Sequence, residues 1–119
     1  MKAKIFEMLN AVPALGKLAD EPLSVKTSYA LAKLNKAVQA ELDIYEKERI
    51  RLCERYGHKN EDKGCYELEA DKQQAFETAI AELQNQETDI CADKIDLSGE
   101  NIKISAREIM TIDSFIKEV

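Results

Sequence analysis

The sequence predicts a single domain, residues 1–119, of mainly α (α+β) class: a long helix in a hairpin-like bundle with a small antiparallel β element. Three observations lead to this prediction. A chain of 119 residues suits one domain. Hydrophobic residues make up 45% and charged residues 34%, with four glycines and two prolines, which is typical of folded helical protein. Residues 24–56 carry one long apolar stripe at helical spacing.

The first segment has apolar residues at steps of three and four, the spacing of one helical face. These residues are Ile5, Met8, Leu9, Val12, Leu15 and Leu18. Pro13 lies within the segment, and a proline removes a backbone amide and clashes with the preceding turn. The sequence therefore predicts two short helical pieces divided near Val12 and ending around Ala19, with a turn at Pro22.

A long helix is expected to begin after Ser24, a residue type that caps helices, and to end at Tyr56, where Gly57 supplies the stop. Its apolar stripe consists of Leu31, Leu34, Val38, Leu42, Tyr45, Leu52 and Tyr56. At about 1.5 Å of rise per residue, this helix spans roughly 50 Å, which is longer than a domain of this size is wide. We therefore expect the helix to protrude or to be covered by a partner.

The middle of the chain predicts a polar turn, a strand and a second helix. Residues 58–64 are polar and glycine-containing, and the alternation over residues 65–69 has the period of a short strand. The second helix is expected from Asp71 to about Glu87. Because it has about half the length of the first helix, it can cover only part of that helix's stripe.

The last third predicts two more strands and a final helix. Alternating runs around the Ser98-Gly99 turn indicate strands within residues 95–104, which would join residues 65–69 in a three-stranded sheet. Ser105 and Glu108 form a capping-box pattern for the final helix. Its apolar face consists of Ile109, Met110, Ile112, Phe115 and Ile116.

Charge is unevenly distributed along the chain. Residues 1–59 carry 11 Lys/Arg and 8 Asp/Glu, residues 60–119 carry 6 and 15, and the formal net charge is −6. This net charge argues against nonspecific binding to nucleic acid or to an anionic membrane. Two interpretations of the acidic half stay open: it neutralises the basic half by packing against it, or it presents a phosphate-like surface to a basic partner.

The stretch from Cys53 to Cys65 contains the only histidine, His58, and two of the three cysteines, the third being Cys91. Four such side chains equal the ligand number of a structural zinc site. The spacing argues against one, because zinc motifs bring ligands in close pairs and this chain has no such pair. We expect no metal and no cofactor, with Cys53 a small core residue and the thiols free in a reducing cytosol.

Neither catalysis nor direct nucleic-acid binding is predicted. His58 sits in a polar turn without a nucleophile, and the sequence has no glycine-rich phosphate-binding loop. Basic residues between Lys47 and Lys59 alternate with glutamates, which is typical of a solvated helical face with ion pairs. No segment has the apolar length needed to cross a membrane or the pattern of a signal peptide.

Self-association is expected, because the long helix carries more apolar stripe than its shorter neighbour can cover. We predict a homodimer or a higher oligomer. The candidate interface residues are Leu42, Tyr45, Leu52 and Tyr56.

Two passages, VKTSYALAKLNKAVQAELDIYEKERIRLCERYG over residues 25–57 and IKISAREIMTIDSFI over residues 102–116, carry a resemblance. With the polar turn, strand and acidic helix between them, they resemble an uncharacterised family of small phage and prophage proteins from Gram-positive bacteria. The likeness rests on a Lys-Thr-Ser-Tyr helix start, a Tyr-Gly helix end and an Ile-Ser…Met…Phe-Ile tail. It implies a phage origin and no chemical activity.

Small non-enzymatic phage proteins mostly act through their surfaces, so the resemblance implies a protein partner. We expect an inhibitor of a host defence effector in the bacterial cytosol, whose acids compete with nucleic acid for a basic channel. The candidate acids are Glu67, Glu69, Asp71, Glu77, Glu82 and Glu87, and the alternative is that they only solvate the surface. Two other functions stay open: a virion or tail assembly component bound to phage structural proteins, and an oligomer that sequesters a small molecule where Tyr56, Tyr66 and Arg107 converge.

Overall fold

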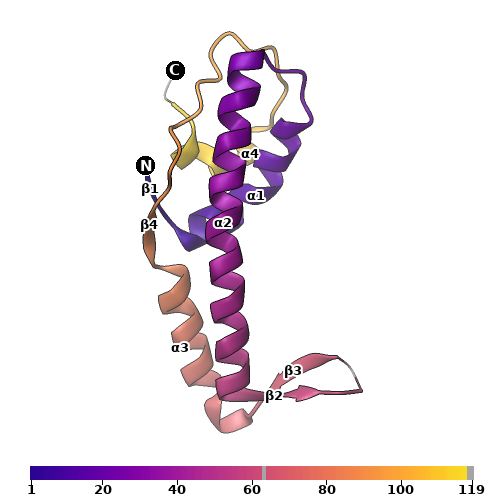
Figure 1. The fold of residues 1–119 in the computed structure, drawn as a ribbon. Helices are drawn as coiled ribbons and strands as arrows, with labels where there is room; N and C mark the ends of the chain where they lie inside the picture. Colours follow the sequence, from indigo (N-terminus) through magenta and orange to yellow (C-terminus); the bar gives the residue numbers. More distant parts are fainter. Residues whose placement is uncertain (63, 118–119) are drawn as a thin grey trace.

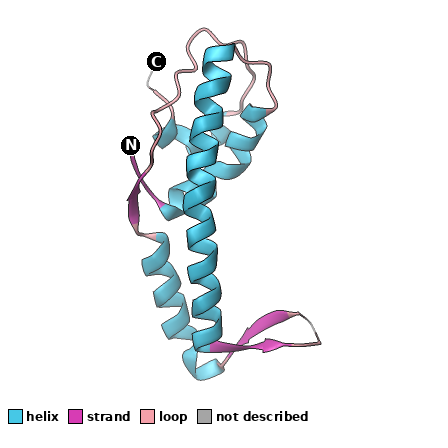
Figure 2. Cartoon of the chain, viewed as in Figure 1, coloured by secondary structure: helices cyan, strands magenta, loops and turns pink. Residues whose placement is uncertain are grey.

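Helix α2 (Val25–Tyr56) forms the long axis of the molecule, which measures 53 × 29 × 24 Å in the computed structural model (Figure 1). The structure describes residues 1–62 and 64–117. Around α2 lie β1 (Lys2–Lys4), α1 (Ile5–Ala19), β2 (Gly57–Asn60), β3 (Cys65–Leu68), the 3-10 helix η1 (Ala70–Lys72), α3 (Gln73–Gln84), β4 (Glu87–Asp89), α4 (Ala106–Ile112) and the 3-10 helix η2 (Asp113–Phe115). Helices dominate, and the strands form two small antiparallel pairs (Figure 2). The mainly α fold with a small antiparallel β element is confirmed.

Helix α2 has the predicted bounds because both of its ends carry local signals. The Ser24 hydroxyl accepts the Thr27 amide at 3.4 Å, which satisfies one free amide of the first turn. The same hydroxyl donates to Glu100 at 2.6 Å, so the loop near Gly99 is tied to the start of α2. Hydrogen bonds from the Ser24 side chain, the Thr27 side chain and the Ser24 amide, the first having the largest effect, lower the pKa of Glu100, and the helix dipole favours a carboxylate at this end.

Helix α1 is continuous, so the prediction of two helical pieces is wrong. Pro13 lies inside the helix on its exposed side, while Ala11, Ala14 and Leu15 on the inner side are buried against the core. The packing of the inner side holds the helix together although Pro13 has no backbone N–H to donate a hydrogen bond. Val12, expected on the apolar face, is 42% exposed.

The three-stranded sheet is also a wrong prediction. Cys65–Leu68 does form a strand, but it pairs in a hairpin with β2, which begins at Gly57 and takes up residues 58–60 of the expected polar turn. A second sheet joins β1 to β4, with Lys2 opposite Asp89 and Lys4 opposite Glu87. Opposite charges across an antiparallel pair favour this register. The second helix is correspondingly shorter than predicted and ends at Gln84, so Glu87 belongs to β4.

Residues 95–104 pack against the core without forming the predicted strands. Ile95 makes one parallel bridge to Ile116, and its amide donates to the Phe115 carbonyl at 2.9 Å. The alternating side chains Leu97, Ile102 and Ile104 are partly buried, so their pattern reflects burial without a strand partner. The expected turn is present, and Gly99 adopts the left-handed φ of 81°.

The final helix begins as predicted. Ser105 accepts the Glu108 amide at 3.1 Å, and Glu108 completes the capping box. Within the predicted apolar face, Ile112 and Phe115 are fully buried, whereas Ile109 and Met110 are 38% and 77% exposed. α4 packs against α1 and buries only the side that faces α1.

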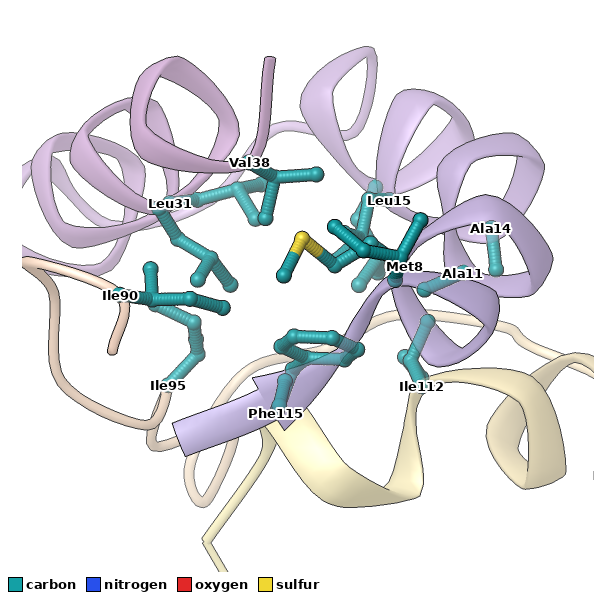
Figure 3. Close-up of a cluster of buried hydrophobic side chains, with 14 of the residues drawn as sticks. Met8, Ala11, Ala14, Leu15, Leu31, Val38, Ile90, Ile95, Ile112 and Phe115 are labelled. Atoms are coloured by element: carbon teal, nitrogen blue, oxygen red, sulfur yellow. The ribbon is translucent and has the colours of Figure 1, made fainter. Parts of the chain in front are cut away.

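The core lies at one end of the molecule, between α1, the first half of α2, the segment after β4, and α4 (Figure 3). Its fully buried side chains include Met8, Leu34, Ile95, Ile112 and Phe115. Apolar side chains from segments far apart in the sequence meet there, so burial of apolar surface joins the two ends of the chain. The other end of α2 extends beyond this core.

Candidate partner-binding stalk

The end of the molecule away from the core is a stalk, which we define as residues 41–56 of α2 with β2, β3, η1 and α3. Here α3 lies beside α2, and the hairpin β2–β3 projects from the end of α2 (Figure 1). No residue of α3 is buried. In the stalk part of α2, only Tyr45 and Cys53 are buried. A pair of helices alone cannot bury an apolar face completely, and an incompletely covered face is typical of a surface that contacts a partner.

Two side-chain contacts hold α3 against α2. The Gln84 amide donates to the Tyr45 hydroxyl at 3.0 Å, near the core end of the stalk. At the other end, the rings of Tyr56 and Phe76 meet edge to face, with centroids 6.4 Å apart and planes at 70°. Such a ring pair contributes about 0.5–1.5 kcal/mol beyond its buried area. The inner side of α3 is therefore held in one orientation.

The four candidate interface residues all lie on α2, but with different exposure. Tyr45 is 6% exposed and belongs to the core of the single chain. Leu42 is partly buried against that core, and Leu52 and Tyr56 are half-buried in the stalk. Leu52 and Tyr56 therefore keep apolar surface that a second chain would cover, whereas Tyr45 has almost none.

The six candidate acids follow one another along β3, η1, α3 and β4. Residues 64–89 contain seven Asp/Glu and a single basic residue, Lys72. Three of the acids have partners: Glu67 accepts the Asn60 amide at 2.6 Å, Glu69 pairs with Lys72 at 3.0 Å, and Glu77 accepts the Gln73 amide at 3.3 Å. The ion pair with Glu69 raises the pKa of Lys72.

The other three acids, Asp71, Glu82 and Glu87, are exposed, and their carboxylates make no hydrogen bond or ion pair within residues 1–62 and 64–117. Glu77 and Glu82 are five residues apart on α3, which places them about 140° apart around the helix. The two acids of α3 therefore lie on different faces of the helix.

One open groove of about 500 Å³ brings a candidate interface residue and a candidate acid together. Its lining consists of Tyr56 from α2 and Gln74, Ala75, Thr78, Ala79 and Glu82 from α3. Its lining thus combines an aromatic ring, small side chains and one carboxylate. A partner that offers an apolar side chain beside a basic one fits this chemistry.

The candidate zinc ligands are placed apart. Cys53 is buried on the inner side of α2, as predicted, and the Arg49 guanidinium donates to its sulfur at 3.8 Å. His58 lies in the hairpin 3.7 Å from Glu67, an ion pair only when the imidazole is protonated. Cys91 follows β4 and is exposed, as is Cys65. No group of three or more metal-binding side chains occurs among the described residues.

A single chain does not bring Tyr56, Tyr66 and Arg107 together. The Tyr66 hydroxyl donates to Glu54 at 3.1 Å, and this hydrogen bond raises the pKa of Tyr66. Arg107 lies on α4, beside the core, where it lines a groove of about 450 Å³ with Phe6, Asn10 and Met110. Tyr56 and Tyr66 belong to the stalk end of the molecule (Figure 1).

Sequence reasoning missed an open cleft of about 990 Å³ between α2 and the segment that follows β4. Lys33 and Lys36 line one wall, and Asp89, Cys91 and Asp93 line the other. The cleft exists because β4 pairs with β1, which places residues 89–93 alongside α2. A pairing between segments that far apart leaves no local sequence signal.

Two further findings bear on what the chain is. Among the described residues, no helix has both the length and the apolar character that crossing a membrane requires. The sequence matches no protein-family model, and neither the curated proteins nor the solved structures contain a significant match to it.

Proposed function

We propose that this chain is a non-catalytic, phage-encoded protein-binding module that inhibits a host defence system in the bacterial cytosol. The observation that carries the proposal is the groove of Tyr56, Ala79 and Glu82 within a segment of seven acids and one lysine. Such a surface suits a basic partner with an apolar side chain at the centre of its contact. The phage origin rests on the resemblance of residues 25–57 and 102–116 to phage and prophage proteins.

The mechanism is competition for a basic channel. A channel that binds nucleic acid concentrates Lys and Arg to attract phosphates, and a set of carboxylates held on a folded scaffold is attracted by the same field. η1, α3 and β4 keep Asp71, Glu82 and Glu87 exposed at set positions. Occupation of the channel by these acids excludes the nucleic acid without any chemical step.

We also propose that two copies of the chain pair through the stalk. In the stalk, α2 and α3 form one layer, and Leu52 and Tyr56 stay half-exposed. A second copy adds the second layer of a four-helix bundle, which is the common way for two-helix units to bury such surface.

The test is affinity capture from infected bacteria with the tagged full-length chain and two variants of equal charge change. The first variant is Asp71→Lys/Glu82→Lys/Glu87→Lys, on the acidic segment. The control is Asp20→Lys/Glu61→Lys/Asp113→Lys, at exposed acids outside it. We expect the chain and the control to retain a nuclease or another defence effector and the first variant to lose it. The captured effector, once purified, should lose its nucleic-acid binding when the chain is added.

Other outcomes would replace the proposal. Recovery of head or tail proteins, with the chain present in purified virions, would make it an assembly component. Equal capture by both variants would show that the acids only solvate the surface. Capture of no protein, together with absence from virions, would leave a small-molecule ligand as the explanation.

A further inference from the structure

The outer side of α2 carries a continuous stripe of exposed residues, most of them basic. The stripe consists of Lys26, Tyr29, Lys33, Lys36, Ala40, Ile44, Lys47 and Arg51, and all eight are exposed. It includes no acidic residue, although the chain as a whole has a net charge of −6. Residues 25–40 contain three lysines and no Asp or Glu. This basic stripe is separate from the acidic segment used in the proposed function.

The basic stripe stays on one side of the helix. Its members advance 25 residues in seven steps, which is close to the 3.6 residues of an α-helical turn. The core residues Leu34 and Tyr45 each lie two positions from a stripe lysine, which is about 200° around the helix. The stripe therefore runs along the side opposite the core for about 37 Å.

Most of the positive charges in the stripe are not neutralised by direct contacts. Arg51 pairs with Glu48 at 2.9 Å, and the Lys33 ammonium lies 5.0 Å from the Tyr29 ring centre. Lys36 and Lys47 have no ion pair within the part of the chain that the structure describes. Asp89 and Asp93 face Lys33 and Lys36 across the open cleft, but no ion pair within 4 Å joins them among the described residues.

The centre of the stripe is apolar. It consists of Ala40 and Ile44, the latter 59% exposed, between the two basic ends, and Tyr29, 65% exposed, adds an aromatic ring nearer the start of α2. Exposed apolar side chains between lysines favour a protein surface over a phosphate backbone, which offers them no apolar contact. Asp43 and Glu54 lie at the edges of the stripe and would repel phosphates.

The basic stripe of a second copy of the chain is not a suitable partner for this stripe. In a parallel pairing, each lysine would face its own copy. In an antiparallel pairing centred on Ala40, Lys33 would face Lys47. Both arrangements place like charges together, which costs affinity. The occupant must be acidic.

We propose that the basic stripe binds an acidic amphipathic helix of a partner protein. The partner helix lies along α2, with carboxylates over the lysine-rich ends and an apolar residue over Ala40 and Ile44. The residues of the basic stripe recur about once per helical turn. A second helix that lies along α2 presents its side chains at the same interval, so the two rows of side chains can pair. This surface is opposite in charge to the acidic segment, so the molecule binds partners of two kinds.

The test uses a synthetic helical peptide as the probe. Roughly 26 residues match the length of the stripe. The peptide carries Glu toward its two ends and Leu in its central turns, and a second peptide has Lys in place of every Glu. Fluorescence anisotropy of the labelled peptides is followed as the full-length chain is added at low and at moderate salt. We expect the acidic peptide to bind at least about tenfold more tightly than the basic one.

Variants of the chain locate the contact. Lys36→Glu/Lys47→Glu should weaken peptide binding by at least about tenfold, and Ile44→Ser should weaken it at moderate salt as well. The control Lys59→Glu/Lys103→Glu makes the same charge change at exposed positions outside the stripe and should leave binding unchanged. All substituted side chains are exposed, so circular dichroism should show the fold intact in every variant.

Four results would overturn the proposal. Equal binding by the two peptides, or an equal effect of both double variants, would show that the stripe makes no specific contact. Tighter binding of a DNA duplex that Lys36→Glu/Lys47→Glu abolishes would make the stripe a nucleic-acid surface. A change in the mass of the chain alone on Lys36→Glu/Lys47→Glu would assign the stripe to self-association.

Discussion

Gly57 occupies a position that needs space, because it ends α2 and begins β2 with no residue between them. Its φ of −149° is extended backbone that any residue adopts. A Cβ at this position would lie 2.4 Å from the Glu67 carbonyl oxygen and 3.2 Å from the Cys53 carbonyl oxygen. The glycine is therefore required by the close approach of β3 to the end of α2. The sequence predicted that α2 ends at Gly57. The steric reason for a glycine at this position depends on the pairing of β2 with β3.

Replacement of Gly57 by alanine should lower the free energy of unfolding by about 1–3 kcal/mol, because the backbones of β2 and β3 must move apart. Urea denaturation measures this change. Gly16→Ala is the matched control: Gly16 lies inside α1, and a Cβ added there would meet no atom within 4 Å, so alanine should stabilise the helix by about 0.5–1 kcal/mol. Equal effects of the two substitutions would contradict this account.

Glu7 joins the start of α1 to the C-terminal segment. Its carboxylate accepts the Ser114 hydroxyl at 2.7 Å and the Lys4 amide at 2.9 Å. These two hydrogen bonds, that of Ser114 first, lower the pKa of Glu7 in the folded protein below its usual 4.5. Because the pKa of Glu7 is lower in the folded than in the unfolded protein, its ionised carboxylate stabilises the fold at pH values above the unfolded pKa. This stabilisation is lost as the pH falls through the pKa of the folded protein.

We therefore expect Ser114→Ala to reduce the free energy of unfolding by about 0.5–1.5 kcal/mol at pH 7, and to reduce it less as the pH falls below the usual Glu pKa. Denaturation of both proteins between pH 7 and pH 3 measures the difference. Glu7→Gln should remove the pH dependence of that difference, because an amide does not titrate. A difference that stays constant over the whole pH range would argue against the role of the Glu7 carboxylate.

At the scale of elements, local signals predict some segments and long-range pairing decides the others. α2 was predictable because Ser24, Gly57 and the apolar stripe all lie within its own sequence. β1 and β4 were missed because their partners are far apart in the chain and each strand has only three residues. The alternation over residues 95–104 indicated burial correctly, but burial on one side does not supply a strand with a partner.

α3 should be the least stable of the longer helices, because each of its residues stays at least partly exposed. In hydrogen-exchange mass spectrometry of dilute protein, amides of α3 should exchange faster than those of residues 27–38 in α2. Phe76→Ala, which removes the ring contact with Tyr56, should speed exchange in α3 and leave α1 unchanged. Thr78→Ala, at an exposed position of the same helix, is the control. Uniform protection across α1, α2 and α3 would disprove the expectation.

At the scale of the whole molecule, the candidate site was predictable in composition and not in arrangement. The acids of residues 64–89 were visible in the sequence, but the directions in which Glu77 and Glu82 face depend on how Tyr56 and Phe76 orient α3. The lysines of the basic stripe were visible too. Whether these lysines form one exposed surface depends on which side of α2 the core covers. α1 and α4 determine that side through contacts distant in sequence.

Self-association through the stalk should give a mass above the 13.5 kDa of one chain in light scattering, and the mass should rise with protein concentration. Leu52→Glu places a charge on the half-buried stalk surface and should return the mass to that of one chain. Ser28→Glu, at an exposed position of α2 beside the core, should leave the mass unchanged. A mass of one chain at every concentration would rule out the pairing.

Because α2 runs without a break from the core to the hairpin, a rotation of the helix at one end displaces the other end. The helix is about 48 Å long, its first half is packed in the core, and its other end passes directly into β2 through Gly57. Residues 41–56 span about 24 Å beyond the core, so a tilt of about 5° would move the hairpin by about 2 Å. A partner that binds the core end or the hairpin end can thus shift the surface that is exposed at the other end.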